Sequence, residues 1–157
     1  MTNLIRRTVC LSAVLGAFAL MSAPQEAEAG YGRQYYSSWS YYPSRTYYYT
    51  TYHYKPAVTY PTYNYHYCVY YPSQPRYVYY YNPVKRVYWG RYDMKEKGYS
   101  MLKEEDRKEK LEDIPEKAFP EPGKMPVVPE SKDGERITPI DPNTLPDVSD
   151  PDGEKLP

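Results

Sequence analysis

Hydrophobic and polar positions follow three different patterns along the chain. Residues 9–21 form an almost unbroken apolar run that follows two arginines. Residues 30–99 mix tyrosine with small polar and basic residues, and all 23 tyrosines lie between Tyr31 and Tyr99. From residue 100 onward, charged residues and prolines dominate, and apolar residues are isolated. The three parts therefore predict elements of different kinds.

The apolar run near the N-terminus has the features of a secretory signal peptide. Arg6 and Arg7 precede it, and Ala27-Glu28-Ala29 places small residues where signal peptidase cuts. The run of 13 residues from 9 to 21 is too short to span a bilayer. We expect residues 1–29 to be removed between Ala29 and Gly30 and the mature protein to be exported to the periplasm, cell surface or extracellular space. No later stretch predicts a transmembrane segment.

Residues 65–92 predict the one regular element. The runs 65–71, 76–81 and 86–92 are rich in tyrosine and valine, which favour strands. Pro72-Ser73-Gln74-Pro75 and Asn82-Pro83-Val84-Lys85 separate them and suit four-residue turns. This spacing predicts a three-stranded antiparallel meander over about residues 65–92. Alternation along the second strand puts Tyr77, Tyr79 and Tyr81 on one face of the sheet. Along the third strand, it puts Val87 and Trp89 on one face and Tyr88 and Tyr92 on the other.

The meander predicts a covering segment, because neither of its faces is polar. Residues 103–112 favour a helix, and Leu111, Ile114 and Phe119 are the apolar residues in or just after this stretch. We expect a short helix or turn over about residues 103–119 to lay these three side chains on the sheet. A solvated charged coil is the alternative.

Composition limits the rest of the chain. Leu, Ile, Val and Phe make up 16 of residues 30–157, a fraction at which a conventional core becomes doubtful. Residues 30–63 predict a disordered or extended low-complexity arm, with local β structure as the alternative. Residues 120–157 predict a disordered, acidic, proline-rich tail. The predicted fold class is a mostly disordered chain with one small β element, divided into residues 1–29, 30–63, 64–119 and 120–157.

The neutral net charge hides two oppositely charged halves. Residues 30–99 carry nine lysines and arginines against two acidic residues, which gives +7. Residues 100–157 carry nine against sixteen, which gives −7. Opposite charges favour contact between the halves, or between copies of the molecule.

No pattern predicts an enzyme, a cofactor or a metal site. Asp93 and Glu96 are the only carboxylates in residues 30–99, and His53, His66 and Cys68 are too few for a cage of soft ligands. Cys68 is the only cysteine after residue 29, which excludes an internal disulfide there and leaves a thiol bridge to another chain as a candidate. The expected export argues against nucleic acid as a partner.

Tyrosine suits a binding surface, because it joins a flat apolar ring to a polar tip and stacks on arginine. The candidate surface residues are Tyr77, Tyr79, Tyr81, Tyr88, Trp89, Tyr92, Arg76, Arg86 and Arg91. The sequence predicts a non-enzymatic structural or interaction protein of the cell envelope or matrix, in contact with a polymer, a protein or other copies. The alternative is a small module that holds a glycan or peptide on an aromatic sheet.

Three stretches carry a family resemblance. The runs YCVYYPSQPRYVYYYNPVKRVYWGRYD, GYSML and DRKEKLEDIPEKAFPEPGKMPVVPES resemble tyrosine-rich exported proteins of planctomycete bacteria. The resemblance covers about residues 67–134. The resemblance implies a bacterial lineage and secretion of the protein, and it implies no mechanism.

Overall fold

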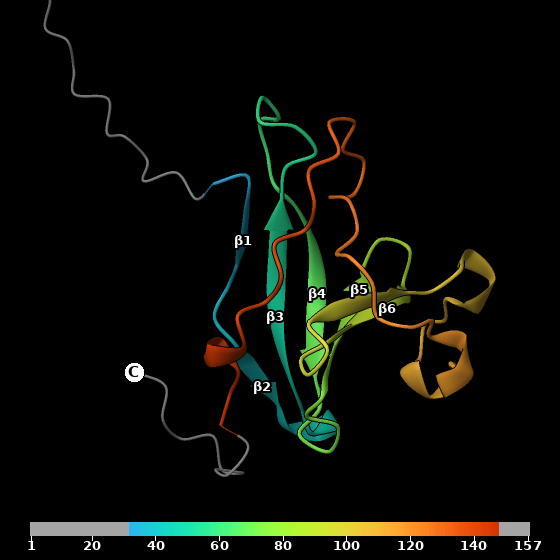
Figure 1. Cartoon of the computed structure of the whole chain (residues 1–157). Coiled ribbons are helices and arrows are strands. Elements are labelled where there is room, and N and C mark those ends of the chain that lie inside the picture. The colour runs from blue at the N-terminus through green and yellow to red at the C-terminus, as the bar shows by residue number, and fades with distance from the viewer. Residues whose placement is uncertain (1–31, 148–157) are drawn as a thin grey trace, which may run out of the picture. The chain divides into compact units, whose positions relative to one another are not determined.

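One antiparallel sheet of seven strands forms the centre of the computed structural model, which describes residues 32–147 (Figure 1). The strands are β1 (Gln34–Tyr36), β2 (Ser40–Tyr42), β3 (Tyr47–Tyr54), β4 (Asn64–Tyr70), β5 (Tyr77–Asn82), β6 (Val87–Asp93) and β7 (Gly98–Met101). Their order in the sheet is β1-β3-β4-β5-β6-β7, and β2 pairs with another part of β3. The expected signal peptide and its cleavage site lie outside the described residues.

The sheet is curled, and β3 is the second strand in its order, between the short strands β1 and β2 and the long strand β4. β5 and β6 run across the direction of β3 and β4 in Figure 1. β3 pairs with β4 from Tyr48 to Tyr54, and with both short strands on its other side. Along β3, every second residue from Tyr48 onward is buried. Tyrosine and threonine favour strands, so the sequence YYYTTYHY of β3 forms one despite its low complexity.

Side chains at the strand ends close the two hairpins that flank β6. Asn82 Oδ1 accepts hydrogen bonds from the backbone N–H groups of Val84 and Lys85, at 2.9 and 3.0 Å. Asp93 Oδ1 accepts from those of Lys95 and Glu96, at 2.9 and 3.1 Å. Asn and Asp are common turn residues because their side chains substitute for backbone acceptors in this way.

Tyrosines build the core on the first face of the sheet. The buried residues contributed by the strands there include Tyr48, Tyr52, Tyr54, Cys68, Tyr70, Val78, Tyr80, Trp89, Tyr92 and Tyr99. Several of their hydroxyls find partners inside the fold, whereas that of Tyr99 is buried without one in the described chain. Tyr52 donates to Gln34 Oε1 at 2.6 Å, and the hydroxyls of Tyr36 and Tyr80 lie 2.9 Å apart. Buried polar groups are tolerated when they are hydrogen-bonded, so tyrosine here takes the place of leucine.

The C-terminal strap, residues 120–147, covers this first face. Met125, Val128, Ile137 and Ile140 are its buried side chains in the tyrosine core. Within the strap, the N–H of Val128 donates to the carbonyl of Glu135 at 2.8 Å, and the N–H of Ile137 to that of Pro126 at 2.9 Å. The strap is therefore a folded element of the protein.

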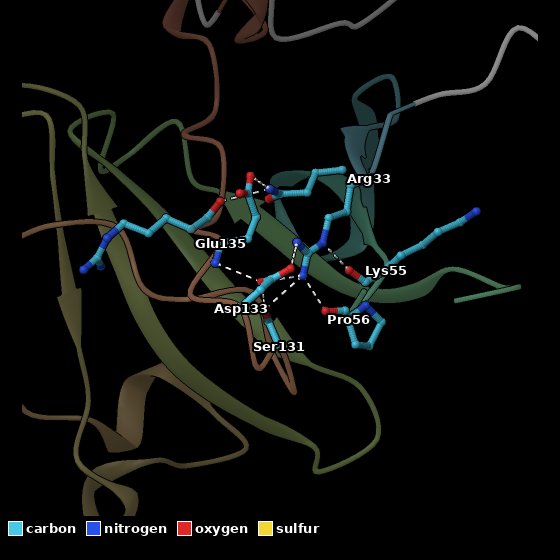
Figure 2. A network of polar contacts seen from close by, with 8 residues as sticks. Arg33, Lys55, Pro56, Ser131, Asp133 and Glu135 are labelled. Carbon is cyan, nitrogen blue, oxygen red and sulfur yellow. Dashed lines mark hydrogen bonds and ion pairs between the residues drawn. The ribbon is translucent and has the colours of Figure 1, made fainter. Parts of the chain in front are cut away.

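Arg33 fastens the strap to the sheet (Figure 2). Its guanidinium donates to the backbone carbonyls of Lys55, at 2.9 Å, and Pro56. It also donates to Ser131 Oγ at 2.9 Å and to the carboxylate of Asp133 at 2.6 Å. One side chain just before β1 thus joins the end of β3 to the strap.

The covering segment, residues 102–119, packs on the second face. Leu102 and Ile114 are buried there with Val69, Tyr79 and Tyr88. Leu111 and Phe119 pack against the same cluster, and the rings of Phe119 and Tyr79 lie 6.1 Å apart. The segment contains three single turns of 3-10 helix, Glu104–Asp106, Leu111–Asp113 and Glu116–Ala118.

Ion pairs link the basic half of the chain to the acidic half. Besides Arg33 and Asp133, Arg86 pairs with Glu109, and Arg91 pairs with Glu116 at 2.5 Å. The contact expected from the opposite charges is therefore present within a single chain.

The predicted fold class, a mostly disordered chain with one small β element, is wrong, because residues 32–147 form an ordered seven-stranded sheet with covering segments. The three expected strands of the meander exist as β4, β5 and β6, but they are the middle of a seven-stranded sheet. The expected arm supplies β1, β2 and β3, and the boundary expected after residue 63 falls between paired strands. Within the expected disordered tail, residues 120–147 form the strap, and residues 148–157 lie outside the described part. The prediction failed because the irregular spacing of the tyrosines in residues 30–63 was interpreted as low complexity, whereas Tyr48, Tyr52 and Tyr54 are part of the core.

The expected faces of the third meander strand also need correction. The register between β5 and β6 shifts after Tyr80, so that Tyr80 lies opposite Gly90 and Tyr81 opposite Tyr88. Trp89 is the extra residue of this bulge. Strict alternation therefore breaks, and Trp89 and Tyr92 lie in the same core cluster.

Candidate functional site

An open groove lies on the second face of the sheet, beside the covering segment. Its volume is about 890 Å³, within the range of roughly 300–1,000 Å³ that is common for ligand sites. Its tyrosines are Tyr42, Tyr47, Tyr49, Tyr67, Tyr71, Tyr81 and Tyr88. Arg45, Val69 and residues 109–112 complete the lining. The groove is thus mainly aromatic, with charged groups among its lining residues.

Strand alternation and ring packing bring these tyrosines together. Tyr47 and Tyr49 lie two residues apart on β3 and point to the same face. The ring centroids of Tyr47 and Tyr71 are 5.4 Å apart with planes at 67°, and those of Tyr49 and Tyr67 are 6.1 Å apart with planes at 89°. Edge-to-face contacts of this kind stabilise aromatic pairs. The rings are therefore held in place before any ligand binds.

Tyrosine hydroxyls give the groove hydrogen-bonding capacity. Within residues 32–147, the hydroxyls of Tyr42, Tyr47 and Tyr49 make no hydrogen bond to the protein. The hydroxyls of Tyr71 and Tyr88 lie 3.5 Å apart. Burial raises the pKa of Tyr47 and of Tyr88 above the ordinary value for tyrosine. Both phenols are therefore protonated at neutral pH and able to donate.

Charged side chains of the groove lining are mostly paired. Glu109 forms an ion pair with Arg86, which lies just outside the lining. Glu112 lies 3.7 Å from the ammonium of Lys110. Arg45 is exposed at the last position of the 3-10 turn Pro43–Arg45. The groove therefore offers carboxylate acceptors and one arginine beside the tyrosine hydroxyls.

The structure separates the aromatic residues predicted for the binding surface. Tyr81 and Tyr88 line the groove. Tyr77 and Tyr79 belong to the same face but pack with the covering segment, and Tyr79 donates to Gln74 Oε1 at 2.6 Å. Trp89 and Tyr92 are buried on the opposite face, in the tyrosine core.

The three predicted arginines hold the fold together. The guanidinium of Arg91 lies between two rings, with its carbon 3.7 Å from the centroid of Tyr77 and 4.1 Å from that of Phe119. It also donates two hydrogen bonds to Glu116, at 2.8 and 2.5 Å. Arg76 donates to Asp93 at 2.6 Å, and Arg86 pairs with Glu109. None of these arginines lines the groove.

Sequence reasoning missed most of the groove residues. Tyr42, Arg45, Tyr47 and Tyr49 come from the stretch expected to be a low-complexity arm. The available signal was propensity, because residues 47–54 consist of tyrosine, threonine and one histidine, and tyrosine and threonine favour strands.

His66 and Cys68 lie in the tyrosine core, away from the groove. Burial, with a smaller effect of the charge on Lys85, lowers the pKa of His66 to about 4. Burial raises the pKa of the Cys68 thiol well above its ordinary value. Cys68, the candidate for a bridge to another chain, is thus a buried protonated thiol. Among residues 32–147, no group of three or more His, Cys, Asp or Glu side chains is placed to hold a metal ion.

The chain matches no protein-family model, and neither curated proteins nor solved structures show a match. Among the described residues, no helix has the length and apolar character needed to cross a membrane. The functional argument therefore rests on the groove itself.

Proposed function

We propose that this protein is an exported, non-enzymatic binding module of the cell envelope or matrix, and that its aromatic groove holds a glycan chain. The observation that carries the proposal is the groove of about 890 Å³ lined by seven tyrosines. A sugar ring has an apolar face and a rim of hydroxyls. A tyrosine offers a flat ring and a polar tip, so it matches both features.

The lining favours a glycan over a peptide. A peptide that adds as a strand needs an exposed sheet edge, whereas the tyrosines of this groove project from a sheet face. A proline-rich peptide docks on aromatic rings but has few N–H donors to offer. The carboxylates of Glu109 and Glu112 line the groove as acceptors. Sugar hydroxyls both donate and accept, so a glycan uses the acceptors and the tyrosine donors together.

Tyrosine-mediated adhesion between copies is the second candidate. Tyr42, Tyr60 and Tyr65 are between 41% and 45% exposed and available for contacts between molecules. Many other tyrosines are used inside the fold, which gives this reading less support than the groove.

A glycan array followed by calorimetry tests the proposal. We expect Tyr49→Ala and Tyr67→Ala each to weaken binding of the strongest array ligand about five- to 100-fold, because one aromatic stacking contact with a nucleic-acid base is worth about 1–3 kcal/mol. Tyr60→Ala is the matched control, since Tyr60 is exposed in the loop between β3 and β4 and outside the groove. Equal losses in all three variants, or no glycan bound by the wild type, would contradict the proposal. Salt-resistant self-association without glycan binding would favour the second candidate.

A further inference from the structure

We propose that the glycan held by the groove is acidic, and that Arg45 binds its carboxylate or sulfate group. This inference rests on the proposed function and names the chemical class of its ligand. The argument starts from the charges around the groove, and from which of them are already neutralised by a partner.

The two carboxylates of the lining each have a cation of their own. Glu109 pairs with Arg86, and Glu112 lies 3.7 Å from Lys110. These pairs leave the wall formed by residues 109–112 close to neutral. Within residues 32–147, Arg45 makes no ion pair or side-chain hydrogen bond. The groove therefore keeps one positive charge without a protein partner, and complementarity calls for a negative group on the ligand.

The surroundings of Arg45 fit an anion. The neighbouring tyrosines Tyr42 and Tyr47 stack with their centroids 5.4 Å apart, and neither hydroxyl is hydrogen-bonded within the described chain. A guanidinium binds carboxylate and sulfate oxygens through paired N–H donors. The phenols of Tyr42 and Tyr47, which line the same groove as Arg45, add O–H donors. The groove thus combines charge with donors, while the remaining tyrosines offer faces for sugar rings.

The same charges argue against nucleic acid, the other acidic polymer that stacks on aromatic rings. A single-strand binding channel carries positive side chains along its whole length to follow the phosphates. Here the groove has a single unneutralised cation, at Arg45. An acidic glycan with intermittent charges suits one arginine better than a chain with a charge on every unit.

Two pairs of probes test the inference on the full-length protein after removal of any signal peptide. Methyl-esterified galacturonate oligomers with only occasional free carboxylates are compared with fully esterified ones, and sparsely sulfated galactan oligomers with neutral galactan. We expect the charged member of at least one pair to bind about three- to tenfold more tightly. This is the gain expected from a single ionic contact that is exposed or only partly desolvated. Which pair shows the difference identifies a carboxylate or a sulfate ligand.

Variants then assign the preference to Arg45. Arg45→Gln should remove the difference within the pair, and Arg45→Lys should restore part of it. Lys95→Gln is the matched control, because it removes the same charge from an exposed position outside the groove. Since Arg45 has no side-chain partner in the described chain, circular dichroism should show that both variants fold.

Several results would overturn the inference. Neutral glycans bound as tightly as acidic ones would refute the role of Arg45 and leave the glycan groove intact. A loss of all binding in Arg45→Gln would assign Arg45 to general ligand contact. Tight binding of a single-stranded oligonucleotide would identify nucleic acid as the ligand in place of a glycan, if its affinity depends steeply on salt. One phosphate contact lowers affinity roughly fivefold for a tenfold rise in salt concentration, so the measured fall would have to be much larger.

Discussion

At the scale of single residues, the core depends on polar side chains that remain buried and neutral. His66 is 5% exposed, its Nε2 lies 3.4 Å from the hydroxyl of Tyr54, and its ring meets Trp89 edge-on at 5.4 Å. Its other ring nitrogen, Nδ1, is buried without a partner in the described chain. A charged imidazolium would gain little in this place, which is why the pKa of His66 falls to about 4.

The lowered pKa of His66 predicts that the free energy of unfolding decreases at acidic pH. Because the pKa of His66 is lower in the folded state than the unperturbed value of about 6.5, the unfolded state binds more protons between these two values. The free energy of unfolding should therefore be highest above pH 6.5 and fall by up to about 3 kcal/mol as the pH drops to 4. Urea denaturation at several pH values measures this. His66→Gln should flatten the profile in that window, and an unchanged slope in this variant would assign the effect elsewhere.

At the scale of elements, a bulge and a close approach determine how β6 packs against its neighbours. The bulge at Trp89 rotates β6 so that Gly90 faces the core, and the ring of Tyr99 on β7 lies directly over Gly90. A Cβ on Gly90 would stand 2.3 Å from the Tyr99 hydroxyl and 2.5 Å from ring carbons of Tyr99. Because Gly90 has no side chain, the ring of Tyr99 can pack directly against its backbone.

Gly90→Ala should be destabilising for this reason. Tyr99 is 3% exposed and has little room to move aside, so we expect a loss of about 1–3 kcal/mol, as for other overpacked cores. Gly32→Ala provides the control, because nothing lies within 4 Å of the added atom. Chemical denaturation of both variants measures the difference. Equal stability of the two would show that Tyr99 relaxes without cost.

The sequence allowed β4, β5 and β6 to be predicted, since their proline-bearing turns mark the strand ends. It did not allow β1 to β3 to be recognised, because Tyr47–Tyr54 contains no aliphatic residue and its burial becomes evident only through pairing with β4. The groove was missed with them. Tyr81 and Tyr88 were predicted from local alternation, whereas Tyr42, Tyr47 and Tyr49 reach the groove through contacts between strands. The bulge at Trp89 had one local signal that the prediction did not use, the isolated Gly90 inside the strand run, which is typical of a bulge.

At the scale of the whole described chain, the fold is completed by segments that follow the sheet in the sequence. The strap was unpredictable from composition, because its buried residues Met125, Val128, Ile137 and Ile140 are few and widely spaced. What orders it is the tyrosine face beneath, together with the contact from Arg33 to Asp133 about a hundred residues away. A proline-rich segment of this kind needs a preformed surface to fold upon.

The Arg33 contact predicts a local change in strap stability. Asp133 accepts hydrogen bonds from Arg33 and Ser131, which hold the pKa of its carboxyl well below the ordinary value. Asp133→Asn removes the charge, so we expect faster hydrogen exchange at the amides of Val128 and Ile137, with little change in β4 and β5. Lys132→Gln, at the adjacent exposed position, is the control. Uniform acceleration over the entire sheet in Asp133→Asn would mean that the strap and the sheet open as one unit.

The placing of β3 has a consequence for how this protein avoids forming fibrils. Its sequence YYYTTYHY is uncharged, rich in strand-forming residues and free of proline, which is typical of segments that stack into amyloid. In the fold it lies between β4 on one side and β1 and β2 on the other. The outermost strands are only three or four residues long, and β7 is further bridged to Gly123 of the strap. Short and blocked edges deny an incoming chain a template, so this aggregation-prone segment is shielded from other copies by its neighbours in the sheet.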